Sequence, residues 1–149
     1  MKLFQIEEPD GSPSDPDAPG AAVGIDASGA LAEVAVAVGG NAAILADREG
    51  FERALPVPTA DAALTEWQAL FEGAKLRAER GLARPVTHAV VALAAMPDRA
   101  AALILLQAAA AAGLDVLRVV PVDEFTKGET PAEAAAIMAE DLAPRPEGL

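Results

Sequence analysis

The stretch from Arg84 to Val120, RPVTHAVVALAAMPDRAAALILLQAAAAAGLDVLRVV, contains a complete strand–helix–strand unit. Its first part, Val86–Leu93, is β-branched and almost wholly apolar, as expected of a strand that is covered on both faces. An alanine-rich helix from Pro97 to Ala112 follows, and Gly113 ends it. Val116–Val120 is the next strand. The unit places the chain in the α/β class.

Three short strands are expected ahead of this unit. Ala21–Asp26 (AAVGID) is predicted to be a buried strand, Ala32–Val38 a second and Ala42–Ala46 a third. The sequence Gly39-Gly40-Asn41 joins the last two, and glycine readily adopts the positive φ that tight hairpin turns need. These three strands are therefore predicted to be antiparallel.

Helical periodicity appears on both sides of the central unit. A helix from Thr59 to Arg80 carries apolar residues at helical spacing, and Gly81 is its expected C-terminal cap. The last helix, Pro131–Leu142, has proline at its first position. Thr130 and Glu133 match a capping box, so the start of this helix is predicted with its cap.

This order of elements predicts a ribonuclease-H-like α/β fold with a mixed, five-stranded sheet flanked by helices, as a single domain over residues 21–143. Residues 7–20 are rich in Pro, Asp, Gly and Ser. We therefore expect residues 1–20 to form an N-terminal segment with a flexible acidic linker, and residues 144–149 to form a C-terminal tail. Leu3–Ile6 is interpreted either as an edge strand or as a segment that docks on another copy.

Charge and composition exclude several classes of function. The 149 residues include 23 acidic and 11 basic side chains, for a formal net charge of -12, which repels nucleic-acid backbones and anionic membranes. Cysteine is absent, so disulfides, thiolate nucleophiles and cysteine zinc sites are excluded. The N-terminus turns acidic at Glu7 without the long apolar region of a signal peptide, which predicts a cytoplasmic location.

Two separated stretches carry a family resemblance. Val23–Pro56 begins VGIDASGALAEVAVAV and ends REGFERALP, and Arg84–Val120 contains the phrases PVTHAV and AGLDVLRVV. In order and spacing they resemble the ATPase domain of the heat-shock-70 chaperone family, with its G-I-D-L-G-T-T-N opening, its V-A-V strand and its A-G-L-x-V helix end. The resemblance covers about half of the chain and implies the first lobe of an actin-like ATPase.

The resemblance also assigns a phosphate loop. Asp26 matches the family aspartate that organises the water shell of magnesium, and Ser28 and Gly29 stand where the family has its glycine- and threonine-rich turn. Both threonine hydroxyls are missing, so Asp26, Ser28 and Gly29 are predicted to be a vestigial nucleotide-binding loop. The alternative for Asp26 is a strand-end aspartate bonded to nearby amides.

The other family motifs are altered. Pro121 and Val122 stand where the family has asparagine and a glutamate implicated in hydrolysis, and Asp123 and Glu124 supply a carboxylate only after a shift. The residues similar to the family belong to one lobe, whereas the family binds nucleotide between two. We predict a non-catalytic, truncated interaction or assembly module without cofactor or metal. The alternative is an ATP- and magnesium-binding protein completed by a second lobe in trans.

Carboxylates and a single histidine are the other candidates for catalytic chemistry. A ribonuclease-H-like sheet could hold a two-metal nuclease site, for which the candidate carboxylates are Asp26, Glu66, Asp98 and Asp123. The acidic net charge and the lack of a basic strip oppose it. His88 is the only histidine, and without a cysteine or nearby serine nucleophile it is predicted to be structural or on the surface.

The outer face of the alanine-rich helix is predicted to be an interface. Positions that are polar on the outer face of the family helix are apolar here, and Leu103, Leu106 and Ala110 are the predicted interface residues. A helix that is apolar all round has to be covered on all sides. The cover is predicted to come either from a homodimer partner, or from Ile137, Met138 and Leu142 of the last helix.

Overall fold

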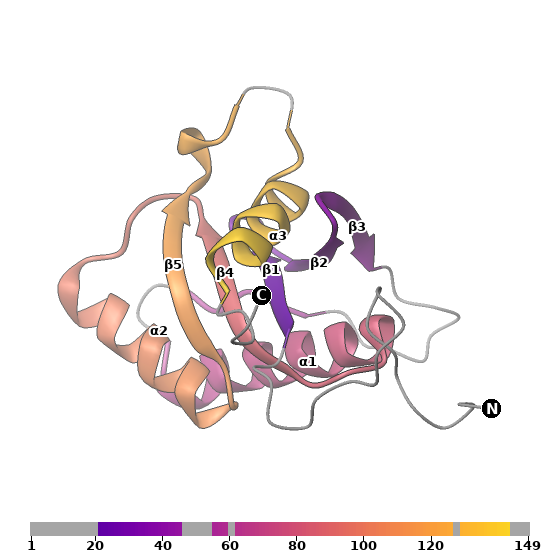
Figure 1. The fold of residues 1–149 in the computed structure, drawn as a ribbon. Helices are drawn as coiled ribbons and strands as arrows, with labels where there is room; N and C mark the ends of the chain where they lie inside the picture. The colour runs from indigo at the N-terminus through magenta and orange to yellow at the C-terminus, as the bar shows by residue number, and fades with distance from the viewer. Residues whose placement is uncertain (1–20, 46–54, 60–61, 127–128, 144–149) are drawn as a thin grey trace.

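A computed structural model describes residues 21–45, 55–59, 62–126 and 129–143 (Figure 1). The expectations for residues 1–20 and for the tail 144–149 therefore lie outside the described residues, as does Ala46 at the end of the third predicted strand.

The described residues form a mixed, five-stranded sheet, as predicted. Its strands are β1 (Ala21–Asp26), β2 (Glu33–Val38), β3 (Asn41–Leu45), β4 (Val86–Leu93) and β5 (Asp115–Pro121), in the order β3-β2-β1-β4-β5. The first three strands are antiparallel neighbours, whereas β4 runs parallel to β1 and β5 parallel to β4. The strand bounds differ from the predicted ones by one residue at most, because alternating apolar residues and glycine turns are local signals.

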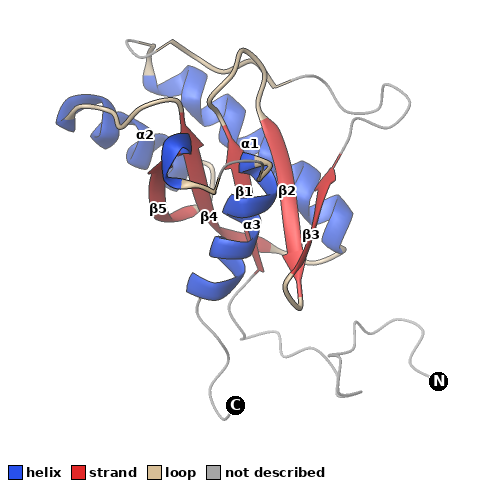
Figure 2. Cartoon of the chain, turned by 90° about the horizontal axis from the view of Figure 1, so that it is seen from above, coloured by secondary structure: helices blue, strands red, loops and turns tan. Residues whose placement is uncertain are grey.

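Helices cover both faces of the sheet (Figure 2). The helices α1 (Leu64–Leu82) and α2 (Arg99–Ala111) pack against each other on one face, and α3 (Pro131–Leu142) crosses the other face over β1, β2 and β4. A short 3-10 turn, Val122–Glu124, follows β5. The cover on both faces explains why β4 is apolar on successive residues.

The helix α3 approaches the centre of the sheet closely. A Cβ added to Gly24 of β1 would lie 2.3 Å from the backbone nitrogen of Ala136 and 2.7 Å from the carbonyl oxygen of Ala132. Because the strand has glycine and the helix has alanine at this contact, the two backbones approach closely. Larger side chains would hold them apart.

The bounds of α1 correct the sequence prediction. The helix begins at Leu64 rather than Thr59 and passes through Gly81 to Leu82, with Ala83 in the left-handed conformation as its C-cap. Gly81 instead makes room for Leu45, whose Cδ1 would lie 2.9 Å from a Cβ at that position. The glycine has a packing role that the local pattern does not reveal.

The termini of the other helices test the predicted caps. Asp98 caps α2 by accepting a hydrogen bond from the backbone N–H of Ala101 at 2.8 Å, and Gly113 follows the helix with φ +88°. The predicted capping box of α3 is wrong, because the side chain of its N-cap, Thr130, accepts no capping hydrogen bond. The carbonyl oxygen of Thr130 still accepts a hydrogen bond from the N–H of Ala134 at 2.9 Å, so the helix begins where it was expected to.

Two carboxylates join helices to strands or their turns. Glu79 of α1 accepts hydrogen bonds from Lys75 Nζ at 2.7 Å and from the N–H of Val86 at 3.0 Å. The Lys75 ammonium and then the Val86 N–H hold the pKa of Glu79 below its usual value. On the other face, Glu140 of α3 accepts hydrogen bonds from the N–H groups of Gly39 and Gly40 at 2.7 and 2.8 Å, which ties α3 to the β2–β3 turn.

None of the helices in the described part of the chain is long and apolar enough to cross a membrane.

Candidate functional site

The predicted phosphate loop follows the carboxyl end of β1. Asp26, the last residue of that strand, is only 8% exposed. Its Oδ1 atom accepts hydrogen bonds from the backbone N–H of Ser28 at 3.0 Å and from the Ser28 hydroxyl at 2.5 Å. The aspartate therefore closes a turn with its own loop, which is the geometry of the strand-end alternative.

A second segment of the chain holds this loop from outside. The N–H of Ala32 donates to the carbonyl oxygen of Leu55 at 2.8 Å, and the N–H of Val57 donates to that of Ala30 at 2.9 Å. Leu31 and Pro56 form the antiparallel bridge between them. The loop is therefore fixed by β-type hydrogen bonds.

Gly29 has no conformational reason to be glycine. A Cβ added there would meet nothing closer than the carbonyl oxygen of Leu31, at 3.9 Å. The glycine leaves room in the loop, but an alanine would fit the same space.

The donors of this loop fit a nucleotide phosphate poorly. A phosphate loop needs several N–H and hydroxyl donors directed at one anion. Here the N–H and the hydroxyl of Ser28 both donate to Asp26, and that carboxylate would repel a phosphate at the same place. The residues Asp26, Ser28 and Gly29 therefore form one loop, but the donors of Ser28 are directed at Asp26 and not at a ligand.

The carboxylates nominated for a nuclease have separate positions. Glu66 lies in the first turn of α1, Asp98 caps α2 and Asp123 lies in the 3-10 turn after β5. Within the described ranges, no group of three or more His, Asp or Glu residues is placed to hold a metal ion. The four candidates therefore do not form one site in this part of the chain.

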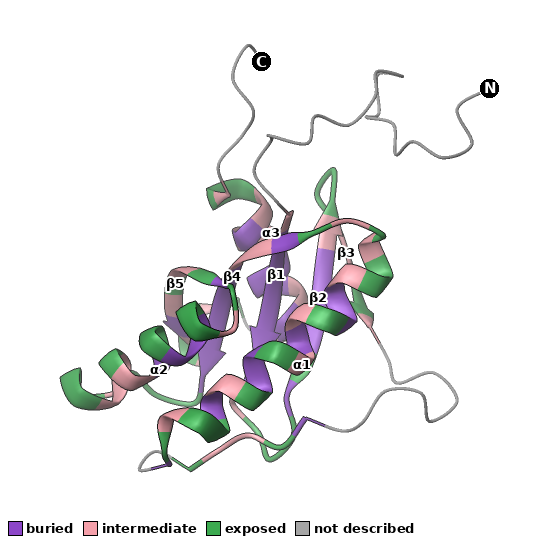
Figure 3. Cartoon of the chain, turned by 90° about the horizontal axis from the view of Figure 1, so that it is seen from below, coloured by how far each residue is buried: buried purple, intermediate pink, exposed green. Residues whose placement is uncertain are grey.

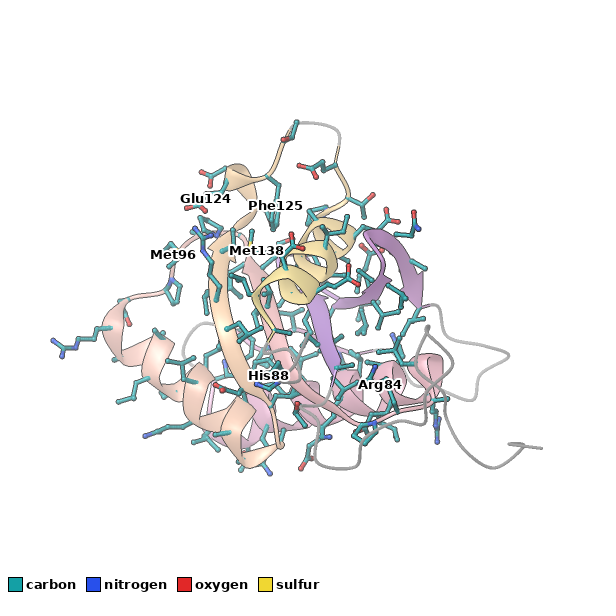
Figure 4. The ribbon with its side chains drawn as sticks, in the orientation of Figure 1. Arg84, His88, Met96, Glu124, Phe125 and Met138 are labelled. Carbon is teal, nitrogen blue, oxygen red and sulfur yellow. The ribbon has the colours of Figure 1, made fainter. Side chains whose placement is uncertain are left out.

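The shifted glutamate after β5 also has a local partner. Glu124 lies 3.4 Å from Arg118 of the same sheet edge, and both side chains are about half exposed. Phe125 follows and packs with Met138 in the cluster under α3 (Figure 4). This end of β5 is stabilised by an exposed ion pair and a small apolar cluster.

The outer face of α2 stays uncovered by the described residues. Leu103 is 55% exposed, Leu106 is 43% exposed and Ala110 is exposed. The prediction that Ile137, Met138 and Leu142 cover them is wrong, because α3 lies on the opposite face of the sheet. The side on which α3 packs depends on long-range contacts, such as the one at Gly24, that no local pattern specifies.

A hollow of ≈ 560 Å³ lies beside this face and was missed by the sequence analysis. Leu106 and Ala110 form its helical wall, and the starts of β4 and β5 complete it with His88 and Val116. Figure 4 shows His88 at the end of the sheet opposite Glu124. The only sequence signal for the hollow was the starts of β4 and β5, because parallel pairing brings the starts of two strands side by side.

His88 lines this hollow beside two other polar residues, Thr87 and Asp115. Its Nδ1 atom lies 2.8 Å from the Thr87 hydroxyl, and its Nε2 atom lies 3.9 Å from Asp115 Oδ2. The side chain is 14% exposed, so the predicted structural role agrees with its burial and its hydrogen bond.

No known protein family matches the chain, and no curated protein sequence matches it.

Proposed function

We propose that this chain is a ribonuclease-H-like lobe of the heat-shock-70 type that acts as a non-catalytic interaction module and forms a homodimer through α2. The mixed sheet in the order β3-β2-β1-β4-β5, with helices on both faces, is compatible with this fold. The resemblance of Val23–Pro56 and Arg84–Val120 to that family supports the assignment.

The observation that carries the proposal is the uncovered face of α2. Two leucines there, Leu103 and Leu106, are about half exposed, and Leu106 and Ala110 also line the adjacent hollow. An apolar patch of this kind on a soluble domain marks an interaction surface. A two-fold dimer buries the same patch on both copies and is the commonest closed assembly.

The phosphate loop supports a role without nucleotide. The N–H and the hydroxyl of Ser28 both donate to Asp26, so a phosphate would have to displace both hydrogen bonds to use these donors. We expect titration calorimetry with ATP or ADP and magnesium to detect no binding tighter than about 1 mM. Tighter binding with turnover would contradict this part of the proposal, and tight binding only beside a second chain would favour completion in trans.

The dimer is tested by light scattering or sedimentation over a range of protein concentrations. Leu106→Glu should raise the dimer dissociation constant by about tenfold or more, because it places a charge at the centre of the apolar contact. Leu142→Glu is the matched control, since Leu142 is 47% exposed but lies on α3.

Two results would contradict the dimer through α2. One is a wild-type protein that stays monomeric at every concentration. The other is an equal effect of Leu106→Glu and Leu142→Glu on the dissociation constant. Circular dichroism of both variants establishes that the substitutions leave the fold intact, since both leucines are partly exposed.

A further inference from the structure

The two edges of the sheet differ in how they are protected against pairing with another strand. At β5 the pairing with β4 is interrupted between Val116 and Arg118, which leaves Leu117 as an extra residue. Asp115 and Arg118 are exposed charges on this strand, and it ends at Pro121. A bulge, charges and a proline are the features that keep an edge strand from pairing.

The edge at β3 has none of these features. Asn41–Leu45 contains no charge and no proline, and it pairs with β2 through five consecutive residues without a shift. Within the described residues, no strand pairs with its outer side. Ile44 on this strand is 38% exposed. An uncharged, regular edge of this kind is a template for a further strand.

Acidic side chains border this edge on the side of α3. A hollow of ≈ 360 Å³ is lined by Gly40, Asn41 and Ala42 from the hairpin, together with Glu129, Glu133 and Ile137 from α3 and the segment before it. Ile44 faces the same side as Ala42, because alternate residues of a strand share a face. A strand added here would meet apolar side chains and carboxylates together.

We propose that residues 2–6 of the same chain, KLFQI, add to the outer edge of β3 as a sixth strand. In a strand, Lys2, Phe4 and Ile6 lie on one face. With that face toward α3, Phe4 and Ile6 cover Ile44 and Ile137, and Lys2 is opposite in charge to Glu129 and Glu133. The match of apolar and charged groups selects this segment as the occupant.

The chain between the two strands is long enough. Residues 7–20 are 14 residues, which span about 45 Å when extended. They lead to Ala21, whose N–H donates to the carbonyl oxygen of Pro85 at the start of β1. β1 is two strands from β3, which is about 10 Å. Either direction of the added strand is therefore within reach.

Disulfide trapping tests the placement, because the chain has no cysteine of its own. The variant Gln5→Cys/Ala43→Cys joins positions on the face away from α3 and leaves Phe4 and Ile6 in place. Under mild oxidation it should form an intramolecular disulfide at least about tenfold faster than Gln5→Cys/Arg118→Cys, whose second cysteine lies on the β5 edge.

The outcomes of this test separate the possible occupants. A disulfide-linked dimer from Gln5→Cys/Ala43→Cys would show that a second copy occupies the edge, and it would overturn the proposal. Equal rates in the two variants, or no disulfide in either, would overturn it as well.

Hydrogen exchange gives a second, independent measurement in the full chain. Phe4→Asp should speed amide exchange in Asn41–Leu45 by about tenfold or more and leave Asp115–Pro121 unchanged, because only the β3 edge loses a partner. Phe4→Leu is the control and should keep the protection. Unchanged exchange at β3 in Phe4→Asp would overturn the proposal.

Discussion

The helices α2 and α3 are both rich in alanine, yet they pack against the same sheet in different ways. α3 buries five residues, all of them alanine: Ala132, Ala134, Ala135, Ala136 and Ala139. α2 buries only Leu105, Ala108 and Ala109 and leaves two leucines exposed, and Figure 3 shows the exposed side of this helix. The same composition therefore produces a central, closely packed helix in one case and a peripheral one with an apolar outer face in the other.

The position of each helix over the sheet explains the difference. α3 crosses the inner strands β1, β2 and β4, and Gly24 lets it approach their backbone. α2 packs against α1 and β5, at the margin of the sheet, so one side of it has no neighbour among the described residues. The small side chain of alanine leads to close packing only where the helix lies over the backbone of another element.

The largest effect is expected from breaking the close packing of α3. Gly24→Ala places a Cβ against the backbone of Ala132 and Ala136, which cannot move without shifting the helix. We expect a loss of more than about 3 kcal/mol in the free energy of unfolding, measured by urea denaturation.

Gly29→Ala is the control for that substitution. Its Cβ meets nothing closer than 3.9 Å, so the change in stability should stay within about 0.5 kcal/mol. Similar losses in the two variants would contradict the close approach of α3 at Gly24.

The next effect compares the two sides of α2. Leu105 is 2% exposed and belongs to the core with α1, whereas its neighbour Leu106 is 43% exposed. Leu105→Ala should cost about 2 to 3 kcal/mol in unfolding free energy, because it leaves a cavity. Leu106→Ala should cost well under about 1 kcal/mol when both are measured at a concentration that favours the monomer. A reversed order would show that α2 is rotated on the sheet.

The smallest effect concerns the two carboxylates that tie the helical layers to the sheet. Glu79 has a pKa held below its usual value by Lys75 and the N–H of Val86. The resulting stability is present above the unfolded pKa, near 4.5, and is lost as the pH falls through the lower folded pKa.

Glu79→Gln should therefore cost up to about 1 kcal/mol at neutral pH, and the difference from wild type should shrink in acid. Urea denaturation at about pH 7 and about pH 3 measures it. Glu140→Gln on α3 is the companion variant. Its amide keeps only one of the two oxygens that accept from the Gly39 and Gly40 N–H groups, so one of these hydrogen bonds is lost. A difference between wild type and Glu79→Gln that grows in acid would contradict the sign of the pKa shift.

Local signals in the sequence predicted most of the fold. The five strands and the Gly39–Gly40 turn appear where the pattern placed them, because each depends on neighbouring residues. The helix α2 begins at Arg99 instead of the predicted Pro97, with Asp98 as its cap. The sequence placed the start of α1 too early, and it predicted a side-chain cap at Thr130 that the structure lacks. Those ends depend on what packs around them, which residue types alone do not encode.

The sequence identified the residues of the candidate site but not how they are arranged. Asp26, Ser28 and Gly29 do form one loop, but the mutual hydrogen bonds of Asp26 and Ser28 are a property of the folded turn. The hollow at His88 escaped the sequence analysis because its walls come from β4, α2 and β5, which meet only in three dimensions.

The sequence by itself determined the α/β class, the strands and their hairpin turn, because apolar periodicity and glycine positions act over a few residues. Only the tertiary structure decided that α3 covers the face opposite α2, and hence that Leu103 and Leu106 are left exposed. The physical reason is that a local pattern indicates only that a helix has an apolar face. Which apolar face becomes buried depends on the backbone of the sheet at Gly24 and on the limited width of the sheet.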